Sequence, residues 1–252
     1  MTNQPRIVRG IIGGRTEIYI PSEAGEIMYV APAVVSKRYQ VVGKRIIANG
    51  LSVPNGDETA LLIHQAYAGG LEDEAKFKGV RKLASNRFFW IFNRNLWTDE
   101  GMFSIPDREA IGMNQHLDEK VLERKVRGHK AVKGVIFGEE GVRFAEKDSY
   151  AFGEMSPDQL AKDGAMIAQY GREGAKLLSE ASATLRNKPV TYGLNIEKGQ
   201  TPETRVSTLV ENVSRLHFGG NALGGKIILG YGCIGCGEGC AFWLRAPIAQ
   251  KI

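Results

Sequence analysis

Two pairs of glycines near the end of the chain constrain its folding more than any other feature. Gly219-Gly220 and Gly224-Gly225 lie in residues 215–232, which read RLHFGGNALGGKIILGYG. Glycine adopts positive φ freely and lets another backbone or a ligand approach closely. Consecutive N–H groups in such a turn can form a nest that binds an anion. The segment therefore indicates either a loop that holds a phosphate backbone or a tightly packed turn between an amphipathic helix and a strand.

The composition bounds the class of protein. The chain has 252 residues, 33 of them Lys or Arg and 28 Asp or Glu, and its formal net charge is +5. This charge is compatible with a nucleic-acid partner but does not require one. The first ten residues lack the apolar stretch of a secretory signal, and apolar runs such as Phe88–Phe92 are far shorter than the ~20 residues of a membrane span. We expect a cytoplasmic protein with no membrane partner.

Local signals predict strands in the first part of the chain and a helix after them. The predicted strands are Arg6–Ile12, Arg15–Ile20 and Glu26–Ala31, which are rich in Ile, Val and Tyr and separated by turn residues. Asp57 is placed to cap a helix that continues to about Tyr67, where Gly69-Gly70 would stop it.

The second half of the chain carries a well-marked helix start. Ser156, Pro157 and Gln159 form a capping box that begins a helix predicted to continue to about Leu185. A second helix is predicted from Thr201-Pro202, burying Val206, Leu209, Val210, Val213 and Leu216. The remaining predictions are a hairpin of Lys133–Phe137 with Val142–Ala145, and strands at Lys188–Ile196, Lys226–Tyr231 and Ala241–Arg245.

The order of these elements predicts an α+β fold with a ferredoxin-like, or RRM-like, βαββαβ core. The middle of the chain is charged and less regular, which favours an insertion. We therefore expect a single domain over residues 1–252 with an inserted subdomain at about 70–150.

Basic residues gather in three segments. In residues 80–97, cations alternate with five aromatic residues, which is typical of a single-strand binding surface but equally of a core element with solvated arginines. In residues 120–133, six Lys and Arg residues accompany one glutamate, which favours a phosphate-facing patch. The candidate RNA-binding residues are Lys37, Arg38, Lys44, Arg45, Arg81, Lys82, Arg87, Arg94, Arg124, Lys125, Arg127, Lys130, Gly219, Gly220, Gly224 and Gly225.

Signals for catalysis and cofactors are weak. Cys233, Cys236 and Cys240 could chelate a zinc ion or an iron–sulfur cluster, but no second CxxC pair accompanies them, so buried or incidental thiols are the preferred interpretation. A GxGxxG pattern begins at Gly230, yet too few residues follow it for a dinucleotide-binding unit. His129 could act as a general base on a ribose 2′-OH, but a surface imidazole is the preferred interpretation. We expect no catalytic residue, no bound metal and no cofactor.

Residues 216–232 resemble the C-terminal glycine-rich signature of the RAMP superfamily of CRISPR-associated proteins, and in particular the backbone subunits that coat the guide RNA. The match covers about 20 residues. The resemblance implies an RRM-like fold whose insertions form a fingers region and a thumb hairpin, and a helix similar in position to Asp57–Tyr67 that faces the guide. The cysteines after the loop are a departure from the pattern. The N-terminal loops at Gly13-Gly14 and Pro21–Gly25 also lack the aspartate of members that cleave target RNA, which points to a non-cleaving subunit.

The leading hypothesis is thus a non-enzymatic RNA-binding subunit that multimerises along a guide RNA within an antiviral ribonucleoprotein complex. Its partners would be the guide RNA, a complementary nucleic-acid target, copies of itself and other subunits. Two alternatives stay open: a repeat-processing endoribonuclease of the same superfamily, and a metal-binding structural or redox protein.

Overall fold

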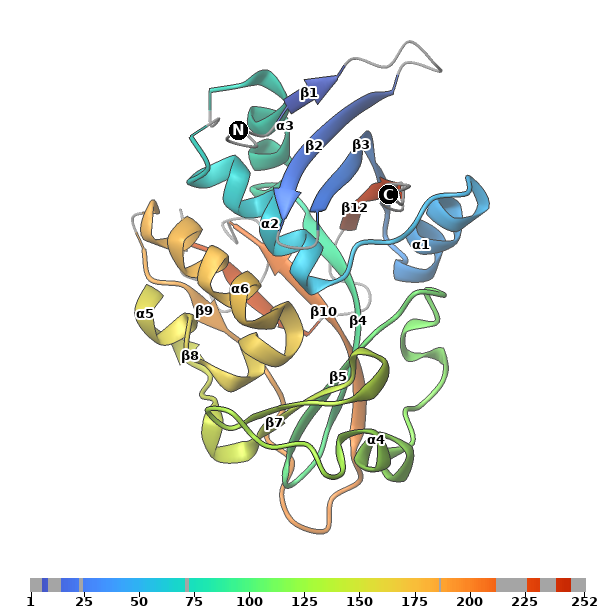
Figure 1. Cartoon of the computed structure of the whole chain (residues 1–252), viewed down its shortest axis with the longest axis vertical. Coiled ribbons are helices and arrows are strands. Elements are labelled where there is room, and N and C mark those ends of the chain that lie inside the picture. Colours follow the sequence, from blue (N-terminus) through green and yellow to red (C-terminus); the bar gives the residue numbers. More distant parts are fainter. Residues whose placement is uncertain are drawn as a thin grey trace.

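A mixed sheet with helices on both faces forms the framework of the chain, an α+β architecture (Figure 1). The structure is a computed structural model that describes residues 6–8, 15–22, 25–70, 73–185, 187–211, 226–231 and 239–245. The helices of the described residues are α1 Tyr39–Ala48, α2 Gly56–Tyr67, α3 Ala75–Ala84, α4 Glu119–Val126, α5 Pro157–Leu160 and α6 Gly164–Ala183.

The strands follow the order β1-β2-β3-β12-β4-β10-β11-β9-β8, and the hairpin of β4 and β5 carries β7 and β6 beyond this path. Two neighbouring pairs are parallel, β12 with β4 and β11 with β9, while the other pairs are antiparallel. The strands are β1 Arg6–Val8, β2 Thr16–Ser22, β3 Gly25–Ser36, β4 Phe88–Trp97, β5 Gly101–Pro106, β6 Val135–Phe137, β7 Arg143–Glu146, β8 Gly153–Glu154, β9 Val190–Thr191, β10 Glu203–Val210, β11 Ile228–Tyr231 and β12 Gly239–Arg245.

Strand β4 is buried along its whole length because helices cover both faces of the sheet at this point. Phe89 and Ile91 pack into the main core with residues of α2 and α6. Trp90 and Phe92 point to the other face, where they pack with Val42 and other residues of α1. The alternation of a strand thus sends successive aromatic rings into two different apolar clusters.

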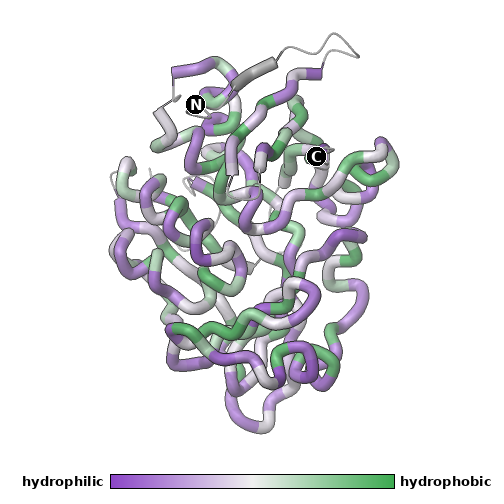
Figure 2. Tube along the Cα trace, viewed as in Figure 1, coloured by the Kyte–Doolittle hydropathy of each residue, from purple (hydrophilic) through white to green (hydrophobic). Residues whose placement is uncertain are grey.

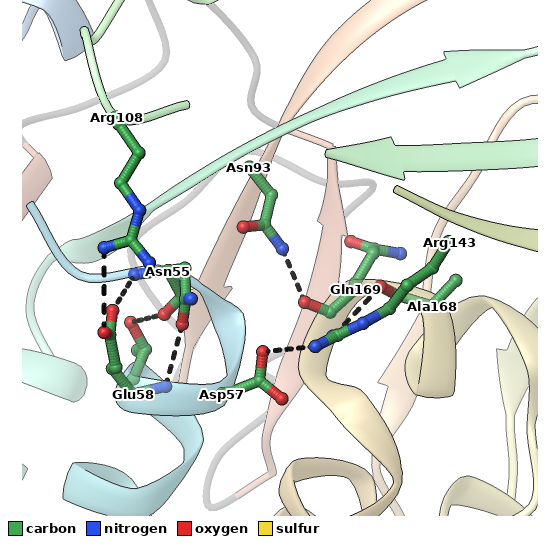
Figure 3. Close-up of polar contacts among 9 residues, drawn as sticks. Asn55, Asp57, Glu58, Asn93, Arg108, Arg143, Ala168 and Gln169 are labelled. Atoms are coloured by element: carbon green, nitrogen blue, oxygen red, sulfur yellow. Dashed lines mark hydrogen bonds and ion pairs between the residues drawn. The ribbon is translucent and has the colours of Figure 1, made fainter. Parts of the chain in front are cut away.

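Helix α6 bends at Gly171, whose φ is +72°. Next to the bend, the carbonyl of Gln169 accepts a hydrogen bond from Asn93 Nδ2 (2.5 Å), and that of Ala168 accepts one from Arg143 Nη1 (3.4 Å) (Figure 3). Arg143 Nη2 also pairs with Asp57 Oδ2 of α2 at 2.8 Å. Side chains from β4, β7 and α2 therefore meet at the bend.

Several predicted elements are confirmed. Strands β2, β3, β11 and β12 lie where the sequence places them, as do helix α2 and the hairpin of β6 and β7. The capping box of Ser156 and Gln159 is present at the start of α5. At α2 the cap is Asn55 rather than Asp57: its side chain accepts the N–H of Glu58, whose carboxylate accepts the N–H of Asn55 (Figure 3).

Three other predictions are wrong or incomplete. Residues 203–210, expected in a helix, form strand β10, whose β-branched Thr204, Val206, Thr208 and Val210 alternate as a strand requires. The long helix expected after Ser156 is two helices, because Asp163 caps a new start at α6. The strand expected at 188–196 spans only Val190–Thr191.

Within the described ranges, no helix combines the length and the apolar character that a membrane crossing requires.

Candidate nucleic-acid interface

A cavity of about 410 Å³ opens beside the first turn of α1, and we call it the α1 cavity. Lys37, Arg38 and Lys44 line it and are exposed. Its other walls come from Trp90 of β4, Asn114 and neighbouring residues. No Asp or Glu is among the described residues that line it, so its charge is wholly positive.

The start of α1 adds to this positive character. The N-cap residue is Arg38, which makes no side-chain cap, and the first turn contains no acidic residue. The first N–H groups of a helix have no partner within the helix and carry the positive end of its dipole. Such an end attracts an anion when no protein carboxylate occupies it.

Buried contacts hold the start of α1 in place. The Tyr39 hydroxyl donates to Asp107 Oδ2 at 2.9 Å, and the same carboxylate accepts the N–H groups of Ile111 and Gly112 at 3.0 and 2.7 Å. Burial, followed by the nearby Asp107 carboxylate, raises the pKa of Tyr39 well above its usual range, so this hydroxyl stays a donor. The indole N–H of Trp90 donates to the carbonyl of Ser36 at 3.3 Å. These contacts hold the buried part of the cavity wall in place beside the exposed cations Lys37, Arg38 and Lys44.

The remaining basic residue of the first cluster, Arg45, lies exposed in the last turn of α1 and does not line the cavity. Sequence reasoning identified the three cations but missed Met113, Asn114 and Val206. These residues lie far apart in the chain, and no motif in the sequence marks them.

Two of the four cations of the second basic cluster, Arg81 and Arg94, donate hydrogen bonds to backbone carbonyls. Arg81 of α3 donates to the carbonyl of Ala66 at 2.5 Å, near the end of α2. Arg94 is 8% exposed and donates to the carbonyl of Gln115, which is at odds with the prediction that it contacts RNA. Lys82 is exposed and Arg87 is half-buried. The aromatic residues of 88–97 lie in the core, so the structure favours the core alternative for this segment over a stacking surface.

The third basic cluster surrounds α4, whose Leu122 and Val126 pack against β5 and Val142. Lys125 forms an ion pair with Glu140, and Arg124 Nε donates to the carbonyl of Lys120 at 3.2 Å. Arg127 and Lys130 are exposed. Helices α1, α3 and α4 lie in three different parts of the molecule, so the three clusters do not form one compact patch (Figure 1).

Part of the predicted site lies outside the described residues: Gly219, Gly220, Gly224, Gly225, Cys233 and Cys236. Cys240 is described and buried on β12, where burial raises the pKa of its thiol to about 12. In the described ranges, no three His, Cys, Asp or Glu side chains are placed to hold a metal ion. His129, the candidate general base, is exposed in the turn after α4.

Comparisons with known proteins found no family model, no curated protein and no solved structure that matches this chain.

Proposed function

We propose that this chain is a non-catalytic RNA-binding backbone subunit of a CRISPR RNA-guided complex, and that several copies assemble along the guide RNA. The observation that supports RNA binding best is the α1 cavity, where Lys37, Arg38 and Lys44 meet an uncapped helix start and no carboxylate. The resemblance of residues 216–232 to the RAMP signature supports the choice of complex.

The α1 cavity suits a phosphate better than a base. Cations and helix N–H groups bind phosphate oxygens, which carry no sequence information. The described wall also lacks an exposed aromatic ring, because Trp90 is 2% exposed and its N–H is engaged. Contacts of this kind position a strand without reading it, as a subunit that coats guides of different sequence must do.

The proposal includes a ferredoxin-like βαββαβ core, with which the α+β architecture and mixed sheet are compatible. The partners proposed are a guide RNA, a complementary nucleic-acid target, further copies of the chain and other subunits, in the cytoplasm. The exposed cations around α4, Arg127 and Lys130, are proposed as additional phosphate contacts.

The test compares Lys44→Ala with Lys198→Ala, two changes that remove one positive charge each. Lys44 lines the α1 cavity, whereas Lys198 lies exposed in a turn that does not. Fluorescence anisotropy with unrelated single-stranded RNAs should show weaker binding for Lys44→Ala, by a similar factor for each sequence. The slope of log affinity against log salt should become shallower by roughly 0.7, the effect of losing one phosphate contact on a single strand.

The Lys198→Ala protein should bind RNA like the wild type. Equal affinities and slopes for all three proteins would remove the α1 cavity from the interface. Cleavage of the RNA during the assay would overturn the non-catalytic part of the proposal, because a backbone subunit should leave the strand intact.

A further inference from the structure

A second cavity, of about 320 Å³, lies against α6 with lining residues on both sides of its bend, and we call it the α6 cavity. Four cations line it from three separate segments: Lys133 before β6, Lys162 between α5 and α6, and Arg172 and Lys176 of α6. Glu173 is the one carboxylate among its described lining residues. Four cations and one carboxylate give the cavity a formal charge of +3. This charge favours an anionic ligand over a neutral one.

Most of these cations have no carboxylate partner within the described part of the chain. No ion pair joins Lys133, Lys162 or Arg172 to an Asp or Glu there, and Lys176 makes only long contacts of 3.9 Å with Glu173 and Glu180. The guanidinium of Arg172 lies over the ring of Phe137, 4.6 Å from its centroid. This contact orients the guanidinium plane while its N–H edges stay available for an anion.

The backbone at Lys133 is unusual. Val132 and Val135 exchange backbone hydrogen bonds of 2.9 and 3.3 Å around a two-residue turn in which Lys133 has φ +55° and Gly134 has φ +72°. Turns with two positive φ values favour Asn-Gly, and a lysine there costs conformational energy. A Cβ at Gly134 would lie 2.4 Å from that of Ser149, so the turn is packed closely against its neighbour. Strained backbone positions of this kind cluster at functional sites, and this one places a cation at the cavity.

The same cavity has an apolar side. Ile167 and Ala161 contribute to its wall, and Val132, at 44% exposure, is one of the most exposed large apolar residues described. A ligand that fits this combination has an anionic group for the cations and a flat or apolar group for Val132.

We propose that the α6 cavity binds the phosphate group of a nucleotide, with the nucleoside lying against Val132. Of its four cations, only Lys133 belongs to the basic segments identified in the sequence, and none lines the α1 cavity. The proposal therefore stands apart from the guide-coating function, and the nucleotide can be free or the phosphorylated end of a strand.

The decisive variant is Lys133→Gly, because glycine adopts positive φ without strain. This change removes one cation while leaving the turn as stable as before or more stable, so a loss of binding cannot come from unfolding. The matched control is Lys198→Gly, which removes one charge from an exposed turn elsewhere. Isothermal titration with adenosine 5′-monophosphate at low ionic strength should show binding to the wild type, binding roughly tenfold weaker to Lys133→Gly, and unchanged binding to Lys198→Gly.

Two further binding experiments test whether the phosphate is required and whether the ligand is a free nucleotide or the end of a strand. Adenosine, which lacks the phosphate, should not bind. An RNA with a 5′-phosphate should displace the mononucleotide if the site takes the end of a strand, and should fail to displace it if the site takes free nucleotides. The proposal is overturned if the wild type binds neither phosphorylated probe, if adenosine binds as well as the monophosphate, or if Lys133→Gly binds like the wild type.

Discussion

At the scale of single residues, Gly171 allows α6 to bend and to pack closely against α2. Its φ of +72° bends α6, and a Cβ there would lie 1.9 Å from Asp57 Oδ1. The carbonyls beside the bend are satisfied by Asn93 and Arg143 instead of by the regular helix pattern. The position therefore combines a backbone conformation and a close approach that only glycine provides.

Replacing Gly171 by alanine should destabilise the protein. We expect a loss of about 1–3 kcal/mol, because a backbone with φ 72° and ψ 167° lies in a region that is open almost only to glycine, and because the new methyl group would displace Asp57 from Arg143. The control is Gly79→Ala in α3, where a Cβ meets no atom within 4 Å. This second change should stabilise the helix by about 0.5–1 kcal/mol. Urea unfolding of both variants measures the difference, and a neutral Gly171→Ala would show that the bend straightens without cost.

At the scale of elements, β10 shows where pattern reading fails. Residues 203–210 carry apolar side chains at Val206, Leu209 and Val210, a spacing that fits one face of a helix. The segment forms a strand instead of a helix because it pairs with β4 and β11 in the middle of the sheet, where both faces are covered. Every residue from Val206 to Val210 is buried, so the apolar–polar alternation of a half-exposed strand is lost there, and only the spacing of the β-branched residues indicates a strand.

Element starts were easier to predict than element lengths. The capping box at Ser156 is a local signal and is present as predicted, whereas the sequence analysis does not predict the second cap at Asp163. Asp163 accepts the N–H of Met166 at 3.0 Å and that of Ala151 at 2.9 Å while being largely buried. Burial outweighs these hydrogen bonds and raises the pKa of its carboxyl to about 6.

This raised pKa predicts a specific pH dependence of stability. Between the unfolded pKa of about 3.9 and the folded value of about 6, the folded state holds more protons, so the Asp163 contribution to stability falls as pH rises through this window. Asn is an equally good cap and does not titrate. The free energy of unfolding of the wild type relative to Asp163→Asn should therefore decrease by roughly 1–3 kcal/mol from pH 4 to pH 7. Parallel pH profiles for the two proteins would mean that Asp163 titrates alike in the folded and unfolded chain.

At the scale of the whole molecule, the sequence was informative about class and much less so about sites. The α+β class, the early strands, α2 and the hairpin of β6 and β7 follow from local composition, which is why they could be predicted. The α1 cavity could not be, because Trp90, Asn114 and Val206 meet Lys44 only once β4, β10 and α1 are packed. Basic residues from these segments also have different structural roles. Arg94 is buried and stabilises the fold, whereas Arg38 is exposed and can contact a ligand. The sequence alone does not separate these two roles.

The last prediction concerns assembly, which is a property of the whole chain. A surface that binds phosphates without reading bases can bind at any register of a strand, so longer RNAs should recruit more copies. Light scattering after size-exclusion chromatography should show complexes whose mass rises in steps of one chain as the RNA is lengthened. Lys44→Ala should need a higher protein concentration to reach the same occupancy, and added salt should have the same effect, because both weaken phosphate contacts. One copy per RNA at every length would contradict a multimerising subunit, while leaving RNA binding by the α1 cavity in place.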